Sequence, residues 1–332
     1  MLKGNMMKIG IIGAGSFGVS LAKHLKENGN EVLIWANSKE TKDLINEKGQ
    51  SKYLPGVNIS GIKASNSLKE VIDGASLIIH VTPSKYFRKV LKEYKEYVKD
   101  DQKIIICSKG IEKESKKTLE EVLKEELPNI SYGVLSGPSH AEEVARNMET
   151  VIVCASEDEK LIKLVMEAFD GERIRIYGSK DVIGVALGGV LKNIIAVSAG
   201  IAYGLNKGDN ALTAIITRGL VELSRFAEKL GADPKTIYGL SGLGDLIVTC
   251  LSEYSRNRKA GILLSKGYTK EEIEKELGMV VEGFDNIDAV YEMSKELNID
   301  TPITDEVYKI LHGETTADDA VKNLMTRKNK YE

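Results

Sequence analysis

The amino-acid sequence predicts an α/β domain with a doubly wound sheet, followed by an all-α domain. Three observations support this prediction. Short apolar runs alternate with helical patterns in the first half of the chain, a glycine-rich turn follows the first run, and helical periodicity dominates after Asp181. Because 332 residues exceed what one ordinary core organises, we expect two domains, over residues 1–180 and 181–332.

The start of the chain has the pattern of a βαβ unit that binds a dinucleotide. A strand-like run, Met7–Ile12, leads into the turn GAGSFG, a helical pattern and a second strand at Glu31–Ala36. We expect Gly13 to form the tight turn, Gly15 to let backbone N–H groups approach a pyrophosphate, and Gly18 to allow close packing of helix on strand. This pattern predicts a Rossmann-like nucleotide-binding domain, and a purely structural glycine turn is the alternative.

Further strand-like runs continue the alternation, at Leu77–Val81, Lys103–Cys107, Tyr132–Leu135, Val151–Ala155 and Arg173–Tyr177. Strands that alternate with helices build a sheet covered on both faces, and such sheets bind ligands at the carboxyl ends of the strands. Lys109 follows one of these strands and is expected to point into that crevice, with an ordinary surface position as the alternative. Gly137 and Ser139 follow the next strand, where Ser139 also fits a helix capping box.

The residues after the second strand bear on the choice of cofactor. NAD-specific sites usually place an acid there, which binds the ribose 2′-hydroxyl. This chain has Asn37, Ser38 and Lys39, and we expect its first acid, Glu40, to lie in the next helix. Because these residues tolerate a 2′-phosphate and are able to bind one, we expect NADP or NAD as the cofactor.

Lys192 lies in the middle of the most apolar stretch of the chain. Residues 182–205 read VIGVALGGVLKNIIAVSAGIAYGL, with Lys192 and Asn193 as the only strongly polar pair. Lysine is rarely buried unless it is paired or used, and burial lowers its pKa. We therefore interpret Lys192 as a catalytic base at the floor of a cleft. One alternative is a transmembrane helix, which has no basic flanks or second apolar segment here; the other is a core helix whose lysine extends to the surface.

Two polar segments interrupt the helical second half. A glycine-rich turn, GLSGLGDL, carries Asp245, and the segment SRNR begins at Ser255. With Ser255 as N-cap and Arg256 in the first turn, free N–H groups, a helix dipole and a guanidinium group come together. This combination suits a phosphate or carboxylate. A capped surface helix with its arginines in solvent is the alternative.

The composition argues against several classes of function. A net charge of −3, 6% aromatic residues and no basic face or tail argue against nucleic-acid binding. The four histidines have no metal-ligand spacing, so we expect no metal. Three widely spaced cysteines and the lack of a secretory apolar region at the start predict a cytoplasmic protein with reduced thiols.

The chain resembles a known enzyme family over nearly its whole length. The motifs GAGSFG, CSKGIE, SGPSHAEEVA, LKNIIAVSAGI, GLGDLIVTC, SRNR and VEG occur in the order and approximate spacing of the bacterial-type NAD(P)-dependent glycerol-3-phosphate dehydrogenases. The resemblance implies interconversion of sn-glycerol 3-phosphate and dihydroxyacetone phosphate, usually to supply glycerol 3-phosphate for phospholipid synthesis. It also implies a helical domain similar to that of 6-phosphogluconate dehydrogenase.

The resemblance implies roles for individual residues, with Lys192 as the proton acceptor. The residues implied at the substrate are Lys109, Gly137, Ser139, Lys192, Asp245, Ser255, Arg256 and Asn257. Besides the glycines of the turn, the residues implied at the cofactor are Ser16, Phe17, Asn37, Lys109, Ala141, Arg256, Val280 and Glu282. Phe17 replaces a more usual Trp or Tyr, and Asn37 stands where many members carry a basic or histidine residue.

The residue chemistry agrees with this resemblance. We hypothesise that Lys192 exchanges the hydroxyl proton at C2, that Lys109 polarises the carbonyl and lowers the pKa of Lys192, and that Asp245 orients Lys192. A β-hydroxyacid or 6-phosphogluconate-type dehydrogenase is the nearest rival, and a silent NAD(P)-sensing regulatory protein is a rival of another class. The partners expected are a small phosphorylated substrate and, in a homodimer, a second copy of the helical domain.

Overall fold

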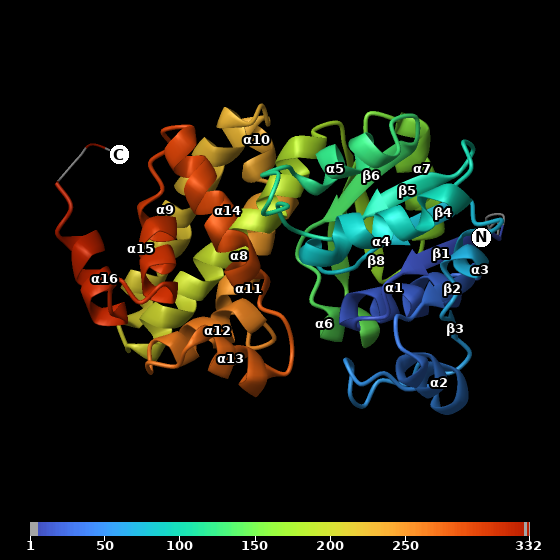
Figure 1. Ribbon diagram of the computed structural model, residues 1–332, viewed down its shortest axis with the longest axis horizontal. Helices are drawn as coiled ribbons and strands as arrows, with labels where there is room; N and C mark the ends of the chain where they lie inside the picture. The colour runs from blue at the N-terminus through green and yellow to red at the C-terminus, as the bar shows by residue number, and fades with distance from the viewer. Residues whose placement is uncertain (1–5, 329–330, 332) are drawn as a thin grey trace.

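The computed structural model describes residues 6–328 and 331, which form a sheet domain and a helical domain side by side (Figure 1). The sheet domain contains the amino-terminal half of the chain. Its strands are β1 (Lys8–Ile12), β2 (Glu31–Trp35), β3 (Lys63–Ser65), β4 (Leu77–His80), β5 (Lys103–Ile106), β6 (Ser131–Ser136), β7 (Thr150–Ala155) and β8 (Ile174–Ser179). The seven strands predicted from apolar runs are all present, whereas the short strand β3 was not predicted.

The eight strands form one sheet in the order β3-β2-β1-β4-β5-β6-β7-β8. The first six strands in this order, β3, β2, β1, β4, β5 and β6, run parallel to one another. Strand β1 lies between β2 and β4, as a doubly wound sheet requires. Strand β7 pairs antiparallel with β6, and β8 is parallel to β7. The carboxyl ends of β1, β2, β4, β5 and β6 therefore meet at one edge of the sheet.

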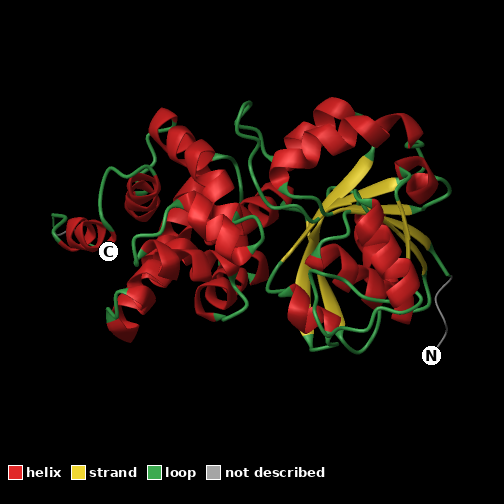
Figure 2. Ribbon diagram, turned by 60° about the horizontal axis from the view of Figure 1, so that its bottom comes forward, coloured by secondary structure: helices red, strands yellow, loops and turns green. Residues whose placement is uncertain are grey.

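Helices cover both faces of the sheet (Figure 2). One face is covered by α1 (Ser16–Glu27), α6 (Ala141–Ala145) and α7 (Glu159–Ala168), and the other by α3 (Leu68–Ile72), α4 (Phe87–Tyr94) and α5 (Leu119–Glu126). Helix α2 (Lys39–Lys48) follows β2, and two 3₁₀ turns, η1 (Ser84–Tyr86) and η2 (Lys95–Tyr97), flank α4.

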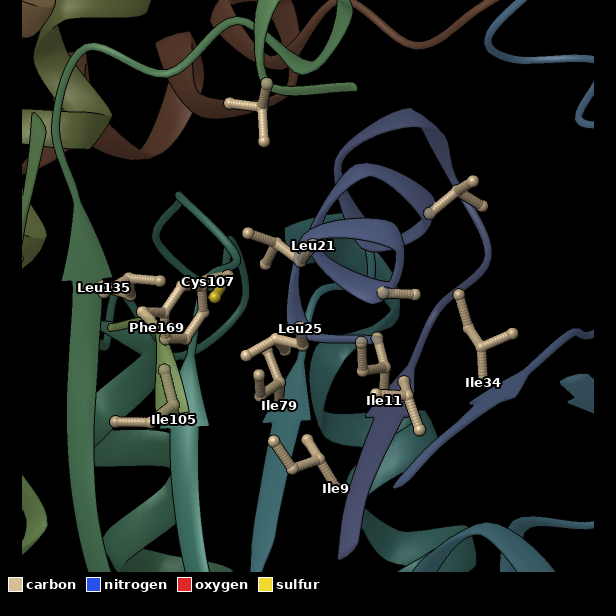
Figure 3. Packing of buried hydrophobic residues seen from close by; sticks show 14 of the residues in the cluster. Ile9, Ile11, Leu21, Leu25, Ile34, Ile79, Ile105, Cys107, Leu135 and Phe169 are labelled. Carbon is tan, nitrogen blue, oxygen red and sulfur yellow. The ribbon is translucent and has the colours of Figure 1, made fainter. Parts of the chain in front are cut away.

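The two hydrophobic cores of the sheet domain follow the alternation of side chains along the strands. Ile9 and Ile11 of β1 pack with Leu21 and Leu25 of α1 in the first core, which Figure 3 shows from close by. Ile12 belongs to the core on the opposite face. Because successive strand residues face opposite sides, both faces of these central strands must be apolar, which explains why they read as continuous apolar runs.

The helical domain is built around α8 (Val182–Gly204), which begins three residues after the last strand ends. The predicted boundary between residues 180 and 181 falls in this connection. The other elements are α9 (Gly208–Lys229), α10 (Pro234–Ile237), the π-helical turn η3 (Leu240–Gly244), α11 (Asp245–Leu251), α12 (Arg256–Leu264), α13 (Lys270–Leu277), α14 (Glu282–Glu296), α15 (Pro302–Leu311) and α16 (Ala317–Met325).

Helix α8 is a core helix. Its length and hydropathy are sufficient to cross a membrane, but 89% of its apolar window is buried inside the protein. Small residues let other segments approach its backbone: a Cβ at Gly188 would lie 2.4 Å from the Ser241 carbonyl oxygen, and one at Gly200 would lie 2.1 Å from that of Arg258. The backbone of α8 therefore lies close to η3, which leads directly into α11, and to α12.

Candidate active site

A cavity of about 790 Å³ opens where the carboxyl ends of the strands meet the helical domain. Its walls come from the β1–α1 turn, the segments after β2, β4, β5 and β6, and helices α8, α11, α12 and α14. Most of the residues expected at a substrate or cofactor line it together: Gly13, Gly15, Ser16, Phe17, Gly18, Asn37, Lys109, Ser139, Ala141, Lys192, Ser255, Arg256, Asn257, Val280 and Glu282. Gly137 and Asp245 are not part of this lining.

The glycine turn has the geometry of a dinucleotide cradle. Gly13 has a φ of +127°, and a Cβ there would lie 3.0 Å from the carbonyl oxygen of Val81 on the neighbouring strand end. A Cβ at Gly18 would lie 2.0 Å from the Gly13 carbonyl oxygen, so α1 packs directly on the turn. Apart from its chain neighbours, Gly15 has no atom within 4 Å of its Cβ position, and it lines the cavity. The space beside Gly15 is therefore open to a pyrophosphate.

Lys192, Asp245 and Lys109 form a buried three-residue ion cluster. Lys192 Nζ donates to Asp245 Oδ1, and Lys109 Nζ donates to Asp245 Oδ2 at 2.8 Å. The three side chains are 7%, 2% and 16% exposed, respectively. The carboxylate therefore joins two ammonium groups from different domains, and Lys192 and Lys109 both reach the cavity.

The cluster sets the protonation of its members. Burial lowers the pKa of Lys192 to about 8, while Asp245 acts to raise it and the Lys109 ammonium lowers it further. Burial also disfavours the charged form of Lys109, but attraction to Asp245 and Glu282 raises the pKa of Lys109 above its ordinary value. The pKa of Asp245 is lowered, because the two ammonium groups outweigh its desolvation. Of the two amines, Lys192 is the one that can exchange a proton near neutral pH.

The segment predicted as a glycine-rich turn is helical, which corrects that expectation. Residues Leu240–Gly244 form a π-helical turn that continues directly into α11. A Cβ at Gly242 would lie 2.0 Å from the Ile237 carbonyl oxygen, so the glycine permits this tight winding. The π-turn places Asp245 in the first turn of α11, facing α8.

Thr249 is a member of the cluster that the sequence reading missed. Its Oγ1 lies 3.1 Å from Lys192 Nζ and donates to the Asp245 carbonyl oxygen at 2.6 Å. Thr249 follows Asp245 by four residues on one helix, so the two share a face. This spacing of four residues was the signal in the sequence from which Thr249 could have been predicted. Thr249 Oγ1 is a second hydrogen-bond acceptor for the Lys192 amine, after Asp245, and so helps to fix the direction in which the amine points.

Asn193 links α8 to two other helices that line the cavity. Its Nδ2 donates to Glu282 Oε2 at 2.9 Å, and its Oδ1 accepts from Asn257 Nδ2 at 2.9 Å. Asn257 Oδ1 in turn accepts from the backbone N–H of Gly283 at 2.9 Å. The side chains of Asn193 and Asn257 therefore already have protein partners, and they hold the start of α14 against α8.

Arg256 is a half-buried cation in the cavity wall. Ser255 caps α12, accepting the N–H of Arg258 through Oγ at 3.2 Å, as expected from the sequence. Arg256 Nη1 donates to the Val280 carbonyl oxygen at 3.5 Å, and within residues 6–328 and 331 no carboxylate forms an ion pair with its guanidinium group. Its charge remains available for an anionic ligand.

The segment after β6 differs from the expected capping box. The N-cap of α6 is His140, without a side-chain cap, and Ser139 Oγ donates to the Gly137 carbonyl oxygen at 3.0 Å. Gly137 has a φ of +141°, a backbone conformation that glycine adopts readily and other residues rarely do. The turn brings Ser139, His140 and Ala141 to the cavity. Burial and the nearby Lys192 ammonium group lower the pKa of His140.

In the described part of the chain, no three His, Cys, Asp or Glu side chains are grouped so as to hold a metal ion. The elements that do converge are a glycine cradle for a dinucleotide, a buried amine with a pKa near neutrality, and an arginine for an anionic group. This combination of fold and site defines an NAD(P)-dependent oxidoreductase that acts on a small substrate.

The comparison with known families gives the particular family. Residues 8–162 match the N-terminal domain of NAD-dependent glycerol-3-phosphate dehydrogenase, and residues 181–322 match the C-terminal domain of the same enzyme. The chain belongs to this family.

Relatives match over nearly the full length of both chains. Glycerol-3-phosphate dehydrogenase [NAD(P)+] of Staphylococcus haemolyticus is 43% identical, over 98% of this chain and 100% of that protein. The enzyme of the same name from Clostridium tetani is 45% identical, over 99% and 96%. A crystal structure of glycerol-3-phosphate dehydrogenase from Coxiella burnetii superimposes with a TM-score of 0.94 at 37% identity, covering 97% of this chain and 99% of that one.

Proposed function

We propose that the enzyme interconverts sn-glycerol 3-phosphate and dihydroxyacetone phosphate, with Lys192 as the acid and base at the C2 oxygen. The single observation that carries this proposal is the position of Lys192: a buried amine, paired with Asp245, in the same cavity as the glycine cradle. When bound there, the nicotinamide of NAD(P) supplies or accepts the hydride at C2.

The proton balance follows from the ion cluster. In the direction of oxidation, neutral Lys192 takes the proton of the C2 hydroxyl while the C2–H hydride leaves, and the product is the ketone. In the direction of reduction, the Lys192 ammonium gives that proton to the ketone oxygen. A pKa of about 8 makes both forms of the amine accessible near neutral pH. Lys109, which stays protonated through Asp245, polarises the same oxygen.

Arg256 is proposed to bind the substrate phosphate. Its guanidinium group has five N–H donors and lies at the N-terminus of α12, where the helix dipole also favours an anion. Binding of the remote phosphate would fix C2 relative to the nicotinamide, which turns a bimolecular encounter into an oriented reaction. Gly137, Ser139 and Asn257 complete the proposed substrate-contacting set, with Ser139 and Asn257 lining the cavity.

The residues of the cavity fit a dinucleotide. The glycine cradle and Ser16 would hold the pyrophosphate at the start of α1, and Phe17 and Asn37 also line the cavity. Ala141, Val280 and Glu282 are proposed to contact the nicotinamide half. Glu282 is held by Asn193 at 2.9 Å, so its carboxylate has a fixed position.

We also propose the setting of the reaction. The product glycerol 3-phosphate would supply phospholipid synthesis, the protein would act in the cytoplasm, and a homodimer would form through the helical domain. Analytical ultracentrifugation of the full chain tests the last of these proposals, and a single species at the monomer mass would overturn it.

A direct spectrophotometric assay tests the proposed reaction. Purified enzyme is mixed with dihydroxyacetone phosphate and either NADPH or NADH, and loss of the reduced cofactor is followed by absorbance. We expect turnover with this substrate and none with 3-hydroxyisobutyrate or 6-phosphogluconate plus the oxidised cofactor. Turnover of either alternative substrate, without turnover of dihydroxyacetone phosphate, would contradict the proposal.

A further inference from the structure

The cavity extends past the glycine cradle to the end of β2. There it is lined by residues from β2, from the connection between β2 and α2, from α2 and from the loop between α2 and β3: Trp35, Asn37, Ser38, Thr41, Lys52 and Tyr53. None of these six residues is acidic. Lys39, the lysine that the sequence suggested for this position, is not part of the lining, and neither is Glu40. Lys52, and not Lys39, is therefore the lysine that lines this end of the cavity.

The loop that carries Lys52 is anchored by its neighbours on both sides. Ser51 is 5% exposed, and its Oγ accepts the backbone N–H of Tyr53 at 3.2 Å. Leu54 is 2% exposed, packs in the core with Ile59, and donates its N–H to the Ser51 carbonyl oxygen at 3.2 Å. Because these contacts hold the backbone at 51–54, the position from which Lys52 extends into the cavity is fixed.

The charge of Lys52 is not neutralised by the protein. Its Nζ lies 5.2 Å from the centre of the Tyr53 ring, and among residues 6–328 and 331 no carboxylate lies within ion-pair distance of it. Asn37, an exposed amide that also lines this part of the cavity, has no side-chain hydrogen bond to any described residue. Glu93 of α4 also lines the cavity, together with Lys89 of the same helix. An unpaired cation and a free amide thus face the cavity together.

We propose that Lys52, with Asn37 in the same part of the cavity lining, binds the 2′-phosphate of NADP, so that this enzyme binds NADPH more tightly than NADH. The inference rests on the proposed dinucleotide site and adds the chemical group at its adenosine end. The glycine cradle places the pyrophosphate at the start of α1, and the adenosine ribose of such a dinucleotide lies at the end of β2. An ammonium group there attracts the phosphate dianion, whereas a ribose 2′-hydroxyl gains little from it.

Binding is measurable without turnover, because Trp35 is the only tryptophan of the chain and lines this part of the cavity. Quenching of its fluorescence gives dissociation constants for NADPH and NADH. Adenosine 2′,5′-bisphosphate and adenosine 5′-monophosphate, as a second pair of probes, isolate the 2′-phosphate. Lys52→Met is compared with Lys48→Met, which removes the same charge from the far end of α2, outside the cavity lining.

For the unmodified chain we expect tighter binding of NADPH than of NADH. Lys52→Met should weaken binding of NADPH and of the bisphosphate by about tenfold, the loss typical of a charged hydrogen bond. NADH, the monophosphate and the Lys48→Met variant should change by less than about twofold. The preference should also decrease as salt is raised, because the site is exposed to solvent.

Three outcomes would overturn the inference while leaving the dinucleotide site intact. They are equal affinity for NADPH and NADH, an equal loss for both cofactors in Lys52→Met, and a loss in Lys39→Met as large as that in Lys52→Met. By contrast, absence of binding by either cofactor would contradict the proposed function itself. The two failures are thus distinguishable in one set of titrations.

Discussion

Lys192 of α8 and Asp245 of α11 form an ion pair in which both side chains are almost completely buried. Each alone would be a costly charge in this position, and together with Lys109 they carry a net charge of +1 when all three are ionised. The cluster therefore holds an excess positive charge beside the cavity, where an anionic substrate would be attracted. It also ties the helical domain to the sheet domain, because Lys109 follows β5.

Replacement of Asp245 tests the electrostatic role of the pair. In Asp245→Asn the two buried ammonium groups lose their carboxylate, so we expect the pKa of Lys192 to fall below about 8. The pH profile for glycerol 3-phosphate oxidation should therefore shift to lower pH, with turnover reduced and stability lowered by about 3 kcal/mol. A profile that keeps its midpoint near 8 would show that Asp245 does not control the amine.

Arg256 is expected to act on substrate affinity. Arg256→Ala should raise the KM for dihydroxyacetone phosphate by roughly tenfold to a hundredfold, the range for loss of a charge-assisted hydrogen bond. Arg256→Lys keeps the charge without the guanidinium fork and should recover only part of this loss. Steady-state kinetics at saturating cofactor measures both. An unchanged KM in Arg256→Ala would rule out the proposed phosphate contact.

Gly18 and Gly15, two of the three glycines of the cradle, offer a matched pair. In Gly18→Ala the new methyl group meets the Gly13 carbonyl oxygen, so we expect a loss of stability of about 1–3 kcal/mol. In Gly15→Ala the methyl group enters open space, so the unfolding temperature should stay the same. It would occupy the pyrophosphate site, and cofactor affinity should fall about tenfold, equivalent to ~1.4 kcal/mol. Thermal unfolding and Trp35 fluorescence separate the two effects, and a stable, cofactor-binding Gly15→Ala variant would contradict the cradle.

His80 is expected to make the protein sensitive to acid. It is fully buried between Tyr94 and Thr82, whose hydroxyl oxygens lie 3.0 and 2.8 Å from its ring nitrogens, and burial lowers its pKa to about 3. Between about pH 6.5 and 3 the unfolded chain binds a proton there that the folded chain does not. Stability should therefore fall with decreasing pH, by up to about 1.4 kcal/mol per pH unit from this group.

The measurement is urea unfolding of the unmodified chain and of His80→Gln at several values between pH 7 and 5. Other buried groups titrate in this range, so the informative quantity is the difference in slope between the two proteins. His312→Gln, at an exposed histidine, is the control. Equal slopes for His80→Gln and the unmodified chain would mean that His80 is not held neutral by the fold.

Most of the fold was predictable because its signals are local. The central strands β1, β4 and β5 are buried on both faces and read as apolar runs, and the glycines at 13, 15 and 18 each have a separate steric reason. Strand β3 has only three residues and could not be recognised from its pattern. The antiparallel direction of β7 depends on which edge of the sheet remains free, and that is a tertiary property.

The candidate site was predictable where one residue contrasts with its surroundings. Lys192 was conspicuous in an apolar helix, and Asp245, which the family motif placed at the substrate, was hypothesised from its chemistry to orient it. Thr249 was missed although it lies one turn from Asp245, because a single threonine in a helix does not by itself indicate a function. Lys52 was missed because nothing in the sequence brings a loop that follows α2 back to the end of β2. Only the fold places that lysine in the cavity.

The central claim is that the Lys192 amine transfers the proton at C2. Its most direct test is the Lys192→Ala variant, with turnover of dihydroxyacetone phosphate and affinity for NADPH measured on the same preparation. We predict a fall in turnover of about 10²–10⁴-fold, the range for loss of a general acid, with little change in the dissociation constant for NADPH. Turnover within a few-fold of the unmodified enzyme would contradict the claim.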